Sequence, residues 1–212
     1  MRAPSIRRPN AVTTLDPRRA ARFVGGLAIA AIGMTLMLRT ELGAAPWEVF
    51  NGGLADLLGL PVALVRYGVV AAIVVAVALL GTRLGAALVL TGFIGATWMA
   101  VFDLVVPAVG DGPLRLAVFT AGLIIMGFGV AVYLHADLGA GPHDALIFTA
   151  ARLSGRPLWL SRMTCEVAAL LAGAFLGGAL GLGTVAFAIG LGPLISLSTI
   201  HLDRWAPIGV DG

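Results

Sequence analysis

The chain contains no lysine, and all fourteen of its basic residues are arginine. Charged residues occupy only 12% of the 212 positions, which is about half of what a soluble domain carries. The single cysteine, Cys165, excludes an internal disulfide. What the sequence has in abundance is apolar: 59% of residues are hydrophobic, and the mean hydropathy is +0.99. This composition predicts a membrane protein.

The basic residues are concentrated at the N-terminus. Six arginines precede the apolar run that begins at Phe23, and arginines in that place set the orientation of a membrane protein. They are not interleaved with aromatic residues, and no zinc-binding spacing accompanies them, so we expect no nucleic-acid partner. Residues 1–21 are predicted to form an arginine-rich cytoplasmic tail, followed by a retained first span rather than a cleaved signal peptide.

Six apolar stretches are long enough to cross, or nearly cross, a hydrocarbon core of about 30 Å. They cover residues 23–38, 61–80, 84–106, 116–134, 158–180 and 184–200. Two more polar segments, 41–59 and 137–155, stand between the first and second and between the fourth and fifth of these stretches. With six spans and both termini in the cytoplasm, eleven arginines face the cytoplasm and three face outward, as expected for an inner-membrane protein.

The arginines do not exclude a topology with eight spans. If residues 41–59 and 137–155 also crossed, only Arg39 and Arg83 would face outward. We prefer six spans because a helix over residues 46–58 would be only about 20 Å long. That segment also carries Glu48, Asn51 and Asp56, which are costly in lipid.

The sequence repeats itself after 96 residues. Between Leu38 and Arg66, eleven of 29 positions are identical to their counterparts in the second half, whereas composition alone would give about a tenth. An odd number of spans in each repeat places the second copy upside down in the membrane. We therefore predict an all-α polytopic membrane protein with two inverted-topology three-span repeats, residues 22–108 and 114–205, that form one membrane domain. Repeats of this kind are common in secondary transporters, which bind their ligand at the repeat interface.

Each repeat carries the motif Leu-Gly-Ala-(Ala/Gly)-Pro-X-(Glu/Asp) after its first span, at residues 42–48 and 138–144. Glycine permits a turn, proline suits the first position of a helix, and an acid in the first turn complements the helix dipole. A short amphipathic helix on the membrane surface explains these residues. A re-entrant half-helix whose acid faces a polar cavity explains them as well. The motif residues singled out are Gly43, Pro46, Gly139, Gly141 and Pro142.

The charged residues inside or beside the spans are the candidate binding residues. Arg66 and Arg162 occupy equivalent positions; each either reaches the nearer interface, pairs with the preceding acid, Glu48 or Asp144, or binds an anionic ligand. Glu166 lies near mid-membrane, where an ionisable group usually faces a cavity or a partner. The simpler alternative is that Glu166 pairs with Arg162 one helical turn away.

The remaining polar and small residues suggest structural roles. Asp103 is expected at the membrane interface, and His143 is expected as polar lining, because no second histidine lies at metal-ligand spacing. The glycine-rich segments 177–184 and 190–193 do not follow a soluble strand, so they are not phosphate loops. Small residues there favour close helix packing, with Pro193 breaking or kinking the last span. The residues singled out are Gly181, Gly183, Thr184 and Pro193.

These residues resemble the YczE/YyaS/YitT-type family of bacterial integral membrane proteins, most closely its YczE branch. The similarity rests on the motif at residues 138–144, on Glu166, and on the glycines at 177–178, 181–183 and 192 with Pro193. The resemblance implies a multi-pass fold in the bacterial inner membrane, and it adds little about a substrate.

The leading functional hypothesis is a small transporter-like or ligand-binding protein. Its unknown small molecule would bind in a midplane cavity lined by Glu48, Arg66, Asp144, Arg162 and Glu166. No nucleophile–base arrangement or cofactor motif is found, so we expect neither an enzyme nor a cofactor. Two alternatives stay open: a membrane scaffold or accessory protein, and the substrate-binding subunit of a vitamin-type importer. The substrate, the coupling ion and the oligomeric state are not determined by these patterns.

Overall fold

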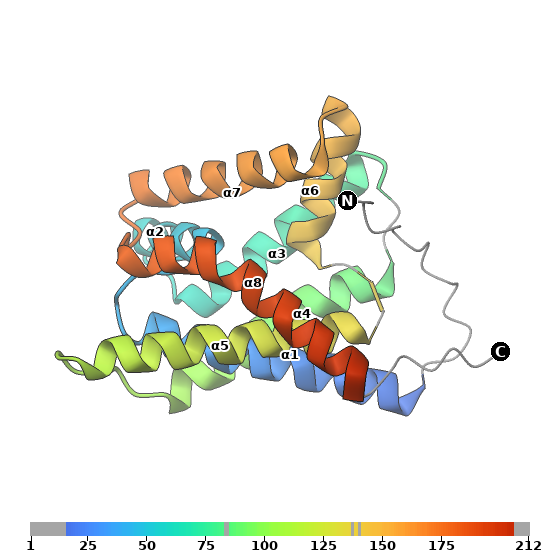
Figure 1. Ribbon diagram of the computed structural model, residues 1–212. Coiled ribbons are helices and arrows are strands. Elements are labelled where there is room, and N and C mark those ends of the chain that lie inside the picture. Colours follow the sequence, from blue (N-terminus) through green and yellow to red (C-terminus); the bar gives the residue numbers. More distant parts are fainter. Residues whose placement is uncertain (1–15, 83–84, 137, 140, 206–212) are drawn as a thin grey trace.

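The computed structural model describes residues 16–82, 85–136, 138–139 and 141–205, and every regular element within these ranges is a helix. Figure 1 shows their arrangement. In chain order the helices are α1 (Pro17–Leu38), α2 (Pro46–Leu58), α3 (Val62–Leu79), α4 (Ala86–Val105), α5 (Leu114–His135), α6 (Pro142–Ser154), α7 (Leu158–Phe175) and α8 (Leu182–Trp205).

Six of these helices, α1, α3, α4, α5, α7 and α8, are long and apolar enough to cross a membrane. The six apolar stretches predicted from the sequence are therefore each represented by a helix. The other two, α2 and α6, have 13 residues each and rise about 20 Å, which is too short to cross. The structure thus describes a multi-pass membrane protein with two additional short helices.

The first and last spans extend beyond their predicted ends. Helix α1 begins at Pro17 because the Asp16 side chain accepts a hydrogen bond of 3.0 Å from the backbone N–H of Arg18 and caps the helix. The segment predicted as an arginine-rich tail therefore includes the first turn of α1, while residues 1–15 lie outside the described residues. Helix α8 continues through Pro193, so of the predicted break or kink at that proline the break does not occur.

The helix bounds recur with the 96-residue spacing of the sequence. The bounds of α6 and α7 are those of α2 and α3 shifted by 96, and α8 begins 96 residues after α4. Both short helices begin with proline and carry an acid in the first turn, as the motif predicted. Glycines with positive φ also recur in equivalent pairs: Gly43 and Gly139, Gly59 and Gly155, Gly81 and Gly177.

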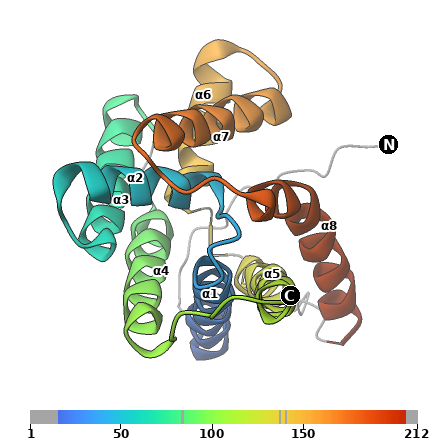
Figure 2. The ribbon, with the colours of Figure 1, turned by 90° about the vertical axis from the view of Figure 1, so that its left-hand side faces the viewer.

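Helices α1 and α5 lie side by side, in direct backbone contact, in the middle of the lower row of helices (Figures 1 and 2). Gly26 lies against Tyr133, and its counterpart Gly122 lies against Met37, which is the counterpart of Tyr133. A Cβ atom on Gly26 would come within 2.5 Å of the Tyr133 backbone nitrogen. Exchanging the two halves turns the Gly26–Tyr133 contact into the Gly122–Met37 contact. The start of α1 thus lies beside the end of α5, and the end of α1 beside the start of α5, so the two helices are antiparallel.

The described helices form two rows. Figure 2 shows α4, α1, α5 and α8 in one row, with α3, α2, α6 and α7 in a second row above it. The halves interlock in the second row, because α2 packs on α7 and α6 packs on α3. Gly173 of α7 lies against the backbone of Phe50 in α2. The hydroxyls of Thr82, just after α3, and Thr149 of α6 are 2.6 Å apart.

Candidate functional site

A buried arginine joins three helices of the first half. Arg66 of α3 is 4% exposed and donates from Nε to Glu48 Oε2 at 2.9 Å, and its Nη2 lies 2.9 Å from the same oxygen. Its Nη1 donates to the carboxylate of Asp103, in the last turns of α4. Asn51 Nδ2 donates to Glu48 Oε1 at 3.0 Å. The predicted pairing of Arg66 with Glu48 is confirmed.

Asp103 has a larger role than the sequence indicated. Besides receiving Arg66, it lies 3.9 Å from Arg39 Nη2, which also donates to the Asp103 backbone carbonyl. Asp103 lies near the end of α4, as the sequence predicted, and it is also the centre of an Arg39–Asp103–Arg66 network. The sequence could not show this, because Asp103 lies 37 residues from Arg66 and its counterpart in the second half is Thr199.

The second half carries an equivalent but more exposed cluster. Arg162 Nη2 lies 2.7 Å from Asp144 Oδ1, and Arg162 Nη1 lies 3.4 Å from Glu166 Oε1. The first of these pairs is the counterpart of Arg66 with Glu48. The Arg162 side chain is 48% exposed, against 5% for Arg66. Glu166 forms the ion pair with Arg162, one helical turn away, that the simpler interpretation of this residue predicted.

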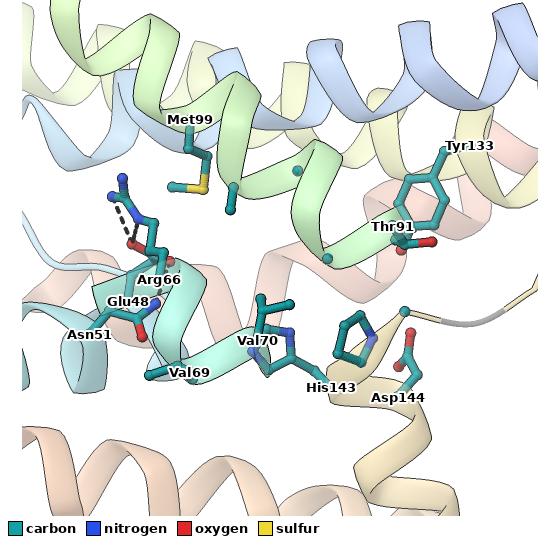
Figure 3. A pocket seen from close by; sticks show the side chains of 15 residues that line it. Glu48, Asn51, Arg66, Val69, Val70, Thr91, Met99, Tyr133, His143 and Asp144 are labelled. Atoms are coloured by element: carbon teal, nitrogen blue, oxygen red, sulfur yellow. Dashed lines mark hydrogen bonds and ion pairs between the residues drawn. The ribbon is translucent and has the colours of Figure 1, made fainter. Parts of the chain in front are cut away.

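A pocket of about 190 Å³ lies between the two rows of helices (Figure 3). Helices α2, α3 and α4 of the first half and α5 and α6 of the second contribute to its lining. Figure 3 shows Glu48, Asn51 and Arg66 at one end, and Tyr133 and Asp144 at the other. Its apolar wall includes Val69, Val70, Ala96, Met99 and Pro142. An apolar cavity of about 150 Å³ holds benzene, so the pocket can accommodate a small organic molecule.

Three of the five predicted binding residues line this pocket: Glu48, Arg66 and Asp144. Arg162 and Glu166 are not among its lining residues, and the structure connects them to it only through the Arg162–Asp144 pair. Their position along the span had placed them near mid-membrane, but depth does not determine the direction in which a side chain points.

Two polar atoms of the pocket lining are buried without a hydrogen-bond partner among the described residues. One is Oδ1 of Asn51, a residue that is 3% exposed, and the other is Nε2 of His143. The His143 ring packs against Trp47, with centroids 4.4 Å apart, and Trp47 is its counterpart in the first half. Unsatisfied buried polar atoms cost about 1–3 kcal/mol each, and they are typical of functional sites.

The pocket side of α4 carries smaller side chains than the equivalent positions of α8. Thr91 and Gly95 line the pocket from α4; their counterparts on α8 are Phe187 and Leu191. Both side chains pack against a buried cluster that includes Met37. The sequence showed these differences, but only the packing assigns one set to a cavity and the other to the core.

The motif glycines bring the start of α8 against the loop before α2. Gly183 N donates to Leu42 O at 2.7 Å, and Ala44 N donates to Thr184 Oγ1 at 3.2 Å. A Cβ atom on Gly43 would lie 2.6 Å from the Thr184 nitrogen. The predicted close packing around Gly181, Gly183 and Thr184 is thus confirmed, and these residues hold the fold rather than line the pocket. Of the second copy of the motif, Gly141 and Pro142 do line it.

The described residues contain no group of three histidine, cysteine or acidic side chains placed to hold a metal ion. The chemistry available at the pocket is therefore that of carboxylates, an arginine, an amide, an imidazole and a phenol. These groups can bind and orient a small polar molecule.

The known proteins most informative about this chain are bacterial and uncharacterised. It is 32% identical over 183 residues to the uncharacterized membrane protein YczE of Bacillus subtilis, covering 83% of each chain. It is 29% identical to an uncharacterized protein of Haemophilus influenzae, covering 80% of this chain and 78% of the relative. The protein YyaS of Bacillus subtilis is 26% identical, with 76% and 82% covered.

No solved structure matches the chain. The predicted resemblance to YczE and YyaS is confirmed by these relatives. A family model matches residues 17–199, which include all six apolar helices in whole or in large part. The chain belongs to the family of unknown function DUF6198.

Proposed function

We propose that this membrane protein binds a small molecule in the pocket between its two halves and carries it across the bacterial inner membrane. The observation that supports this most is that both halves contribute charged residues to one pocket: Glu48 and Arg66 from the first, Asp144 from the second. A ligand there contacts both halves at once, so its binding can be coupled to their relative movement.

The exchange of contacts between the halves supports an inverted repeat. A twofold operation relates Gly26–Tyr133 to Gly122–Met37 and brings the equivalent rings of Trp47 and His143 together. Because α1 and α5 are antiparallel spans, the axis of this operation lies in the membrane plane. That is the symmetry of transporters in which one half rocks against the other around a central site.

The positions of α2 and α6 favour re-entrant helices over surface helices. Their first turns supply Glu48, His143 and Asp144 to the pocket. A helix lying on the membrane surface would instead turn its acids toward water. Backbone that is irregular at membrane depth is tolerated where protein or a polar cavity surrounds it, as the pocket does at these helix starts. Six spans then leave both termini in the cytoplasm.

The proposal is tested by ligand-dependent stability in nanodiscs. A metabolite library is screened against the wild-type protein and Asp144→Asn, with Asp111→Asn as matched control, since the Asp111 side chain is 94% exposed between α4 and α5. A ligand at 100 times its dissociation constant stabilises the fold by about 2.7 kcal/mol. We expect a hit that Asp144→Asn loses and Asp111→Asn keeps, and uptake of that compound into proteoliposomes. If the library gives no hit, the pocket is not a binding site, and a scaffold role is favoured.

A further inference from the structure

The two charged clusters beside the pocket differ in their charge balance. In the first half, Arg39 and Arg66 face Glu48 and Asp103, two positive charges against two negative ones. In the second half, Arg162 alone faces Asp144 and Glu166. The second cluster therefore has a net charge of −1, and of its two acids Asp144 lines the pocket.

No neighbouring base in the described chain supplies the missing positive charge. His143 precedes Asp144 in α6, but burial lowers the pKa of its imidazole and so opposes a positive charge on the ring. Arg152 lies in the last turn of α6, at the end opposite Asp144, and donates to the carbonyls of Leu80 and Gly81. An unbalanced charge at membrane depth is costly, and it usually marks the site of a proton, an ion or a charged ligand.

The charged groups that line the pocket also fit a cation better than an anion. The Nη1, Nη2 and Nε atoms of Arg66 are already engaged with Glu48 and Asp103. An anion entering the pocket would therefore meet two carboxylates and an occupied guanidinium. A cation would meet Asp144, whose cluster has a net charge of −1.

We infer that the ligand is a small organic cation, a protonated primary amine with a short apolar body, whose ammonium group pairs with Asp144. The apolar body contacts Val70, Met99 and Pro142. The pocket volume of about 190 Å³ suits a body of roughly five or six carbon atoms, since an apolar cavity of about 150 Å³ holds benzene. This inference rests on the proposed function and adds the chemical class of the ligand.

The test compares three probes with the same branched five-carbon body: isoamylamine, isoamyl alcohol and isovalerate. Their binding to the full chain in nanodiscs is measured by calorimetry at pH 7, with empty nanodiscs as the reference for partition into lipid. We expect the amine to bind at least about tenfold more tightly than the alcohol and the carboxylate, because only the amine brings a positive charge to Asp144. Asp144→Asn should weaken amine binding by at least about tenfold, and Asp111→Asn should leave it unchanged.

A second variant tests the pocket without altering any charge. Thr91→Phe places on α4 the side chain that α8 carries at the equivalent position, Phe187, and it should abolish amine binding by filling the pocket. This substitution keeps the inference testable even if Asp144→Asn does not fold. Amine binding that survives Thr91→Phe would overturn the assignment to this pocket.

The outcomes separate this inference from the proposed function. Equal binding of the alcohol or stronger binding of isovalerate would refute a cationic ligand while leaving a small-molecule site in place. Stabilisation by sodium chloride relative to choline chloride, with no effect of the amine, would replace the organic cation by an inorganic one. If none of the three probes binds while the metabolite library gives a hit at the pocket, only the ligand class is wrong; if the library also fails, the proposed function is wrong.

Discussion

The two equivalent arginines provide a stability test within one chain. Arg66→Gln leaves Glu48 and Asp103 without their shared partner, and the Glu48 side chain is 9% exposed. Removing one partner from a buried ion pair costs about 3–5 kcal/mol. Arg162→Gln removes the corresponding pair with Asp144, but these side chains are 48% and 26% exposed. Exposed ion pairs contribute about 0–1 kcal/mol, so we expect a loss of about 1 kcal/mol or less.

Unfolding is followed by circular dichroism in mixed micelles of dodecyl maltoside with increasing SDS, under conditions where both transitions are reversible. The double variant Glu48→Gln with Arg66→Gln serves as control, because removing both charges should recover part of the loss. Equal destabilisation by the two single variants would refute the reasoning, since it would mean that the difference in burial between the two clusters has no energetic consequence.

Three further predictions follow from the packing and the topology. Gly129→Val should destabilise the protein by several kcal/mol, because a Cβ there would overlap the Ala30 backbone. Gly95→Ala should be nearly neutral, because nothing lies within 4 Å of its Cβ position. The same unfolding assay measures both variants. Thr149→Val should cost about 1 kcal/mol, since it removes one partner of the 2.6 Å hydroxyl contact with Thr82, and Thr164→Val, at an exposed hydroxyl that bonds only within its own helix, is the control. In a Cys165→Ser background, Asp111→Cys should react with an impermeant maleimide added to intact cells, whereas eight spans would place residue 111 in the cytoplasm and protect it.

Much of the site could be predicted because the same pattern of residues occurs in both repeats. The acid in the first turn of a short helix and the arginine of the next span occur at 48 and 66, and again at 144 and 162. Two independent copies of one spacing indicate a contact, and both pairs are formed. The helix starts were predicted equally well, because proline at the first position and an acid in the first turn act locally.

What the sequence did not reveal depends on long-range packing. Asp103 pairs with Arg66 across 37 residues and has no acidic counterpart, so neither local spacing nor the repeat indicates it. Glu166 was placed by its depth along α7, but its angular position turns it to Arg162 on the same helix. The pocket lies where α4 carries small side chains. Small residues in a sequence are as compatible with tight helix contact as with open space, so they did not indicate a pocket.

The differences between the repeats therefore carry as much functional information as their similarity. A strictly symmetric pair of halves would offer two equivalent pockets and two equivalent ion pairs. Here Phe187 and Leu191 of α8 pack against a buried cluster, whereas the equivalent Thr91 and Gly95 of α4 line the pocket. Asp103 balances the charges of the first cluster, while Glu166 leaves the second with a net charge of −1. The first half thus supplies a neutral, buried cluster to the pocket. The second half supplies Asp144, whose ion pair is less buried, so a change in ligand or in charge can alter this contact at a lower energetic cost.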